Sequence, residues 1–219
     1  MPWKPQTKAA HGCGSEIVPA FAPVLSIDLE MFRNLPPQQN IARGQVLLEQ
    51  GKLAPFVHLI AGGLVKLTHL NPDGHEQTIG LRSSGWYSGA VSVLMNAPSA
   101  YSVQAITPCL AHAIPAELFN VQLMQNAKVM KHFIRALCHE LCSLAAAQVE
   151  IMSHSAADRL LRFLEERSMT GLTWKAIDPM PVLKKQELAQ LLSISPEHLS
   201  RLLHKYGPCD EVSEVKLTG

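Results

Sequence analysis

Short apolar runs separated by turn signals occupy the first half of the chain, from Ile41 to Pro115. The runs recur at roughly ten-residue spacing, which is typical of an all-β roll or barrel. The strongest turn signal is Asn71–Gly74, because an Asn-Pro-Asp-Gly sequence favours tight turns. We therefore predict a hairpin there and strands over 45–49, 56–60, 64–70, 75–81, 101–106 and 110–114.

From Ala127 onward the apolar residues recur every three or four positions, with few helix breakers up to Ser153. This period predicts one helix of roughly 40 Å, at 1.5 Å per residue. Two partners stay open for its apolar stripe, the same helix of a second subunit or the chain's own β-roll, and both can hold because the helix has more than one apolar face. As a candidate dimerisation surface the stripe comprises Val129, Phe133, Leu137, Leu141, Leu144, Gln148 and Ile151.

The remaining segments divide the chain into four parts. Ser26 is the expected N-cap of a short amphipathic helix that ends at Leu35, and another helix is expected over 155–168. Glycine and proline residues then break the helical pattern. The predicted parts are an N-terminal arm over 1–25, a β domain over 26–125, the long helix over 126–153 and a C-terminal domain over 154–219.

Two short helices around a three-residue turn are indicated by residues 185–205. Ser195 is a favourable N-cap and Pro196 suits the first helical position, so a new helix begins there. Ala189 is small where the second helix must cross the first closely. The face that both helices bury comprises Leu188, Leu192, Ile194, Leu199 and Leu202.

The outward face of the second helix carries side chains that can read DNA. Arg201 can donate two hydrogen bonds to guanine, and Glu197 can accept from cytosine N4 or orient Arg201. The alternative is an ordinary helical hairpin with a solvated outer face. The formal net charge is only +1, so the nucleic-acid hypothesis rests on this motif and not on bulk charge. The candidate DNA-binding residues are Gln186, Ser195, Pro196, Glu197, His198, Ser200, Arg201 and Lys205.

The segment Ser195–Leu203 resembles the recognition helix of the Crp/Fnr superfamily, and its Glu197, Ser200 and Arg201 match the Fnr-like branch and the nitric-oxide-responsive regulators. The glycines between residues 43 and 66 are similar to the glycine framework of the family's cyclic-nucleotide-type roll. The resemblance implies a non-enzymatic, sequence-specific transcription regulator.

The fold implied by this resemblance is α+β. It has an effector-sensing N-terminal β-roll over 26–125 (a double-stranded β-helix of the cyclic-nucleotide-binding type), a dimerisation helix over 126–153 and a C-terminal winged helix-turn-helix over 154–219. The resemblance further implies a homodimer on double-stranded DNA, at a palindrome of TTGAT-like half-sites about one helical turn apart. RNA polymerase is an additional expected partner.

The roll is expected to sense a signal other than cyclic AMP. Family members that bind cyclic AMP use Gly-Glu before the phosphate loop and Arg-Ser further on, where this chain has Gly89-Ala90 and Ser99-Ala100. A phosphate buried without a cation carries a large desolvation penalty. The candidate effector-pocket residues are Trp86, Tyr87, Gly89, Ala90, Ser99, Ala100 and Tyr101.

Other sensing schemes depend on cysteine and histidine. An iron–sulphur cluster is not expected, because the arm offers Cys13 alone and one cysteine cannot hold a cluster. A carbon-monoxide scheme is not matched, since residues 81–101 contain neither Cys nor His. Haem stays open as a cofactor, and with it the alternative of a haem-based gas or redox sensor. Candidate haem ligands are His11, His58, His69, His75, His112, His132 and His139.

A third alternative is a protein-interaction module whose helix-turn-helix no longer binds DNA. The near-neutral charge favours it, as does the short C-terminal wing, for which Glu214–Thr218 offers one strand. Cys138 and Cys142 lie four residues apart on one helix face, where they either share a metal or redox signal or are small buried thiols.

The chain shows no signal-peptide pattern and no apolar stretch long enough to span a membrane, and its five cysteines are irregularly spaced. We therefore expect a cytoplasmic protein with reduced thiols, no membrane partner and no metal site. No nucleophile elbow, P-loop, dinucleotide fingerprint or zinc-protease motif is present, so no enzyme is expected.

Overall fold

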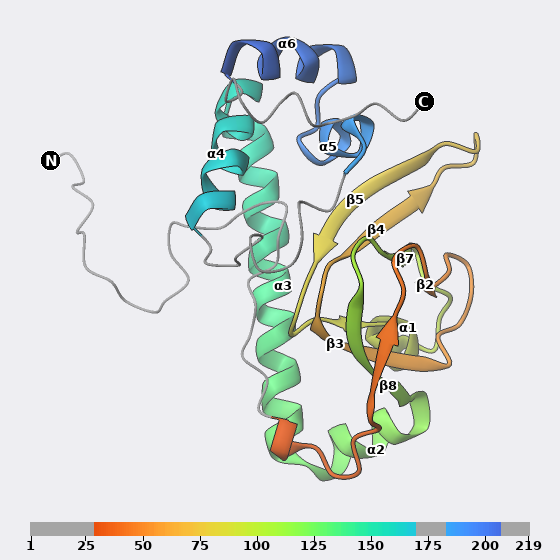
Figure 1. Ribbon diagram of the computed structural model, residues 1–219. Coiled ribbons are helices and arrows are strands. Elements are labelled where there is room, and N and C mark those ends of the chain that lie inside the picture. The colour runs from red at the N-terminus through yellow and green to blue at the C-terminus, as the bar shows by residue number, and fades with distance from the viewer. Residues whose placement is uncertain (1–28, 170–182, 207–219) are drawn as a thin grey trace, which may run out of the picture.

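The computed structural model describes residues 29–169 and 183–206, with side chains over 29–163 and 183–206. Within these residues, eight antiparallel strands form a β-roll (Figure 1). The strand order is β1-β8-β3-β6 in one sheet and β2-β7-β4-β5 in the other, so β5 is an edge strand. The strands are β1 (Gln38–Ile41), β2 (Val46–Leu48), β3 (Phe56–Gly62), β4 (Val65–Leu70), β5 (Glu76–Arg82), β6 (Tyr87–Ser88), β7 (Ser102–Ala105) and β8 (Cys109–Pro115).

Turn chemistry positions the β4–β5 hairpin as expected. The N–H of Gly74 donates to the carbonyl oxygen of Asn71 at 2.9 Å, and Gly74 takes a positive φ of 82° that glycine adopts without strain. All six predicted strands are present with ends shifted by a few residues. β1 and β6 were missed, because strands of four and two residues show too little alternation to be recognised.

Two apolar clusters stabilise the roll, since burial of apolar surface is the main driving force of folding. One joins the two sheets, and its members Ile60, Val65 and Val103 are fully buried. The other lies between the β1–β8–β3–β6 sheet and the helices that follow, where Phe119 and Val129 are fully buried. The helices thus extend the core of the roll rather than forming a separate one.

The helices follow most of the predicted boundaries. The long predicted helix is confirmed with its bounds as α3. The helix expected over 155–168 is present as α4, with both ends shifted by one residue. The helix expected from Ser26 to Leu35 is wrong in its described part, where only the 3-10 turn Leu29–Met31 forms, because Asn34 has a positive φ of 56° and two prolines follow. Ser26 itself lies outside the described residues. The helices are α1 (Ala90–Met95), α2 (Ala116–Gln125), α3 (Ala127–Ser153), α4 (Ala156–Met169), α5 (Lys185–Leu191) and α6 (Pro196–Tyr206).

The long helix α3 runs along one side of the roll and continues beyond it towards α4 (Figure 1). Val129 and Phe133 pack into the core of the roll and are 0% and 3% exposed. The chain's own roll therefore covers these two residues, and the dimerisation role expected for them stays an untested prediction. Farther along the helix Leu141 and Leu144 are 68% and 53% exposed. The apolar stripe of α3 is therefore covered at its start and exposed to solvent at these later positions. No helix of the described segments is long and apolar enough to cross a membrane.

The junction between α3 and α4 is held by two arginines. Arg159 donates from Nη1 to the carbonyl oxygen of His154 at 2.7 Å and from Nε to that of Leu192 at 3.0 Å. Arg162 donates from Nη1 to Glu150, also at 2.7 Å. Because hydrogen bonds of charged donors are the stronger kind, these contacts tie the C-terminal helices to the end of α3.

Candidate nucleic-acid interface and sensor interior

Helices α5 and α6 pack with α4 around one apolar cluster, in which Ala189 and Leu199 are fully buried. The turn between them passes through Ser193 at a positive φ of 53°, a conformation that favours glycine. The two helices lie where the sequence pattern puts them. The predicted wing strand Glu214–Thr218 lies outside the described residues, so the complete winged domain stays a prediction.

The amino end of α6 is capped by Ser195, whose Oγ accepts a hydrogen bond from the N–H of His198 at 3.1 Å. Pro196 occupies the first helical position, as the sequence predicts. The predicted DNA-binding residues lie on α5 (Gln186), at the cap of α6 (Ser195) and on α6 itself; His198 and Ser200 are half-buried, whereas Gln186, Ser195, Pro196, Glu197, Arg201 and Lys205 are exposed.

Charges on this surface are arranged around Glu197. Its pKa is lowered, first by a hydrogen bond from its own backbone N–H and then by the Ser195 hydroxyl and the charges of Arg201 and Lys185. Glu197 therefore carries a negative charge at neutral pH. Lys185 also donates from Nζ to the Oγ of Ser200, which leaves the hydroxyl hydrogen of Ser200 available to an acceptor.

Lys185 is the functional candidate that sequence reasoning missed at this surface. It lies in the first turn of α5, next to the predicted contact Gln186. The available signal was a basic residue at the start of the first helix, since lysine suits phosphate as a point charge.

The predicted effector-pocket residues are divided between the two cores of the roll. Tyr87 packs edge-on against Phe133, with ring centroids 5.3 Å apart, on the side of α3. Trp86 and Tyr101 pack on the other cluster, between the sheets. Trp86 lies just before β6 and Tyr87 begins it, so the two neighbours pack on different sides of the roll. The burial of Tyr87 raises its pKa.

The remaining four effector-pocket residues serve local structure. Gly89 precedes α1 at a positive φ of 85°, and Ala90 is 2% exposed in the first turn of that helix. The Ser99 hydroxyl donates to the carbonyl oxygen of Tyr101 at 2.7 Å, and the carbonyl oxygen of Ala100 lies 2.9 Å from Nδ1 of a histidine. None of these four residues supplies a cation for a phosphate.

A buried cation nevertheless lies in the roll, at Arg82 on β5. Its side chain is 6% exposed, and its Nε donates to both carboxylate oxygens of Glu140 on α3 at 3.1 and 2.9 Å. Burial raises the pKa of Tyr101, and the charge of Glu140 adds to this rise while the charge of Arg82 opposes it. Sequence reasoning missed Arg82, although a charged residue at the end of the apolar run Ile79–Leu81 was a detectable signal.

The candidate haem ligands within the described residues are spread over several elements. Nδ1 of His112 lies 2.6 Å from the carbonyl oxygen of Pro36, and His132 packs edge-on against Tyr87. No group of three or more His, Cys, Asp or Glu side chains in the described part of the chain could hold a metal ion. His11 and Cys13 lie outside the described residues, and the others occupy β3 (His58), β4 (His69), the following turn (His75), β8 (His112) and α3 (His132, His139, Cys138 and Cys142).

Two clefts lie between the roll and the C-terminal helices, away from the predicted effector-pocket residues. The larger, of about 550 Å³, separates the β4–β5 hairpin from α5 and includes Lys66, Glu76 and Gln186 in its lining. The smaller, of about 220 Å³, lies among β5, α3, α4 and α5 and includes Glu150 and Arg159. The edge of β5 borders both clefts.

The sequence pattern of the cyclic nucleotide-binding domain matches residues 38–126. In the structure this span begins with β1 and ends just beyond α2, so the match covers the whole roll. The match begins at residue 38 and ends at residue 126, whereas the β domain expected from the sequence spans 26–125, and these domain boundaries stay a prediction.

Relatives extend the similarity beyond the roll. The cyclic AMP receptor protein of Thermus thermophilus is 26% identical over 193 residues, which cover 87% of this chain and 85% of that protein. The nitrogen fixation regulation protein FixK of Bradyrhizobium diazoefficiens is 22% identical over 201 residues, covering 89% and 83%. The solved structure of the c-di-GMP-responsive global regulator CLP of Xanthomonas campestris superposes with a TM-score of 0.65 at 20% identity, covering 81% of this chain and 89% of that one.

Proposed function

Because this chain belongs to the Crp/Fnr superfamily of transcription regulators, we propose that it binds double-stranded DNA as a homodimer, through α5 and α6. The observation that carries the proposal is the N-capped helix α6, whose Glu197 and Arg201 are exposed on the side away from the apolar cluster. Such a helix can enter the major groove and present its first turns to base edges.

The side chains divide into base-reading and backbone-contacting groups. Arg201 donates two hydrogen bonds to a guanine, and the ionised Glu197 accepts from cytosine N4 or orients Arg201. Gln186, Lys185 and Lys205 contact phosphates, and the N–H groups at the start of α6 add to them. The trio of Glu197, Ser200 and Arg201 selects a TTGAT-like half-site.

The exposed part of the α3 stripe is the proposed dimer surface. Leu137, Leu141, Leu144 and Ile151 are 42%, 68%, 53% and 49% exposed at near-heptad spacing, with the exposed Gln148 between them. A stripe of this kind is stabilised when it packs against the same helix of a second subunit. Two recognition helices then meet two half-sites of one operator.

The roll is proposed to sense a ligand other than cyclic AMP. Ala90 and Ala100 lack the polar groups that would hold a ribose and a phosphate, the Ser99 hydroxyl is bonded to its own loop, and the buried Arg82 is paired with Glu140. A phosphate in this interior would have to break that ion pair or remain without a cation, and both carry a penalty.

Gel-shift titration of a TTGAT-type palindrome against an unrelated duplex, at low and moderate salt, tests DNA binding. Arg201→Ala should weaken operator binding by about 1–3 kcal/mol and relax the choice at one guanine. Lys205→Ala is the matched control, because loss of a phosphate contact weakens all sequences alike and reduces the salt slope by about one. Equal binding of both duplexes by the unmodified protein would refute the proposal.

A further inference from the structure

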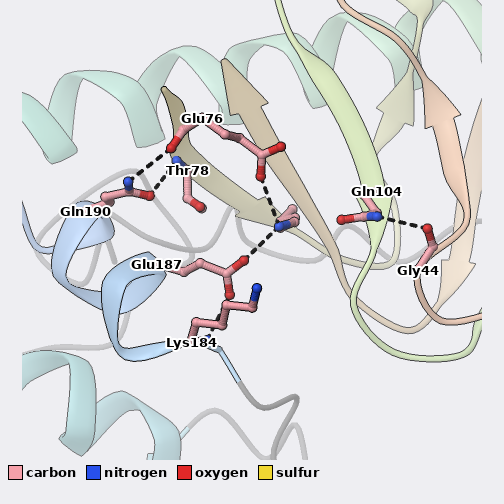
Figure 2. Close-up of polar contacts among 8 residues, drawn as sticks. Gly44, Glu76, Thr78, Gln104, Lys184, Glu187 and Gln190 are labelled. Carbon is pink, nitrogen blue, oxygen red and sulfur yellow. Dashed lines mark hydrogen bonds and ion pairs between the residues drawn. The ribbon is translucent and has the colours of Figure 1, made fainter. Parts of the chain in front are cut away.

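The free edge of the β2–β7–β4–β5 sheet is occupied by a side chain from the C-terminal helices. Gln190 of α5 accepts a hydrogen bond at Oε1 from the N–H of Thr78 at 2.8 Å. Its Nε2 donates to the carbonyl oxygen of Glu76 at 3.2 Å, as Figure 2 shows. The amide thus satisfies the donor and the acceptor that a neighbouring strand would otherwise pair.

A charged contact reinforces this docking. Lys66 on β4 donates from Nζ to Glu187 of α5 at 2.7 Å and to Glu76 of β5 at 3.3 Å. The side chains of Lys66 and Glu187 are only 10% and 14% exposed, so water screens the pair weakly. The second oxygen of Glu187 accepts the N–H of Lys184 at 2.8 Å, which couples the start of α5 to the same contact (Figure 2).

Polar residues make the contact between the hairpin and α5 on the side of the larger cleft. The cleft of about 550 Å³ that separates them is lined largely by polar side chains, so little apolar packing supports the docking there. Removal of one or two hydrogen-bonding groups should therefore release α5 from the edge of β5.

The docked position leaves the proposed base-reading residues Glu197 and Arg201 of α6 open, while Gln186 of α5 lines the cleft towards the hairpin. α5 meets the hairpin, whereas α6 lies beyond α5 at the end of the molecule opposite α2 (Figure 1). Glu197 and Arg201 of α6 are exposed. A contact that does not cover the reading face can instead hold its angle. A dimer on two half-sites at a fixed spacing benefits from this. Orientational freedom of α6 that is already restricted in the free protein does not have to be lost on binding.

We propose that Gln190, together with the Lys66–Glu187 pair, positions α6 for a two-half-site operator by docking α5 onto the free edge of β5. The proposal rests on the proposed DNA binding. Gln190 contacts no DNA in it and acts through the orientation of α6, so its removal impairs the match between two half-sites more than the reading of one.

The test compares Gln190→Ala with unmodified protein on three duplexes, which are a TTGAT-type palindrome, the same palindrome with one base pair inserted at its centre, and a single half-site. A net hydrogen bond corresponds to about a two- to tenfold change in an equilibrium constant, and Gln190 makes two such bonds in each subunit of a dimer. We expect affinity for the correctly spaced palindrome to fall about tenfold, half-site affinity to change little, and the preference for correct spacing to shrink.

Gln104→Ala is the matched control, because Gln104 also donates from Nε2 to a backbone carbonyl, that of Gly44 at 2.9 Å, but entirely within the roll (Figure 2). It should leave the spacing preference unchanged. An unchanged spacing preference in Gln190→Ala would overturn the proposal. Tighter operator binding by this variant would also overturn it, because docking would then inhibit DNA binding.

Hydrogen exchange of the Thr78 amide gives a readout that needs no DNA. Its N–H is protected by Gln190 in the docked form and should exchange faster in Gln190→Ala while neighbouring β4–β5 amides stay protected. Lys66→Met, a second variant, should accelerate the same amide. Equal exchange in all proteins overturns the docking, whereas failure of the unmodified protein to prefer its operator refutes only DNA binding.

Discussion

Replacement of Glu140 with alanine leaves a buried guanidinium without its partner. Arg82 is 6% exposed and donates to Glu140 from Nε and Nη2, while its Nη1 donates to the carbonyl oxygen of Leu81 at 2.7 Å. The pair joins β5 to the middle of α3. The Glu140→Ala variant therefore measures how much this pair contributes to the stability of the roll and to its attachment to α3.

The expected loss follows from burial. Breaking a buried ion pair by removal of one partner costs about 3–5 kcal/mol. Glu140 is 23% exposed, so water can reach the vacated position and the loss should be about 2–3 kcal/mol. For a chain of 219 residues this corresponds to a Tm lowered by about 5–10 °C. Arg82→Leu with Glu140→Leu should recover most of the loss, because it removes both charges together.

Urea unfolding followed by far-UV circular dichroism, at one protein concentration, measures the free energies of the single and double variants. Glu49→Ala is the control, since Glu49 pairs with Lys52 in an exposed contact whose side chains are 55% and 67% exposed. We expect the control to lose at most about 0.5 kcal/mol. A Glu140→Ala loss no larger than that of the control would refute the argument that burial makes this pair strong.

Three further outcomes are expected. Leu141→Asp should convert a dimer into monomers in sedimentation measurements, whereas Val121→Asp, on the exposed side of α2, should not; a dimer retained by Leu141→Asp would argue against the α3 surface. Ser193→Gly should raise the free energy of unfolding by about 0.5–1 kcal/mol, because relief of strain at a positive φ of 53° outweighs the greater chain entropy of glycine; a lower Tm would contradict this. Burial lowers the pKa of His58 and His132, so the unfolded chain binds their protons more readily. The stability contribution is then fully present above the unfolded pKa of about 6.5 and is lost as pH falls below it. His132→Gln should therefore reduce the difference between the free energies of urea unfolding measured about one pH unit above and about one pH unit below that value.

The best-predicted elements are those whose signals are local. α3 follows from a 3.6-residue period, and the start of α6 from the Ser195 cap and Pro196, because these depend on contacts within a few residues. The same period could not tell which part of α3 meets the roll and which part stays open. Val129 and Leu141 belong to one stripe in the sequence, yet the first is fully buried and the second is 68% exposed.

The predicted effector-pocket residues show that sequence position alone does not give side-chain direction. Trp86 and Tyr87 are neighbours in the chain, but Trp86 packs on the cluster between the sheets and Tyr87, at the start of β6, on the cluster beside α3. Residues 99–100 offer no cation in the sequence itself, and the buried cation Arg82 was not recognised, since only its contact with α3 distinguishes it from a surface arginine.

The sequence by itself determined the β-roll, the long helix and the helical pair near the C-terminus, because periodicity, caps and turn residues act over short distances. Only the tertiary structure decided which polar groups meet. Arg82 and Glu140 are 58 residues apart, Thr78 and Gln190 are 112 apart, and Lys66 and Glu187 are 121 apart. Such pairs form when packed elements bring distant side chains together, and no local pattern records that geometry.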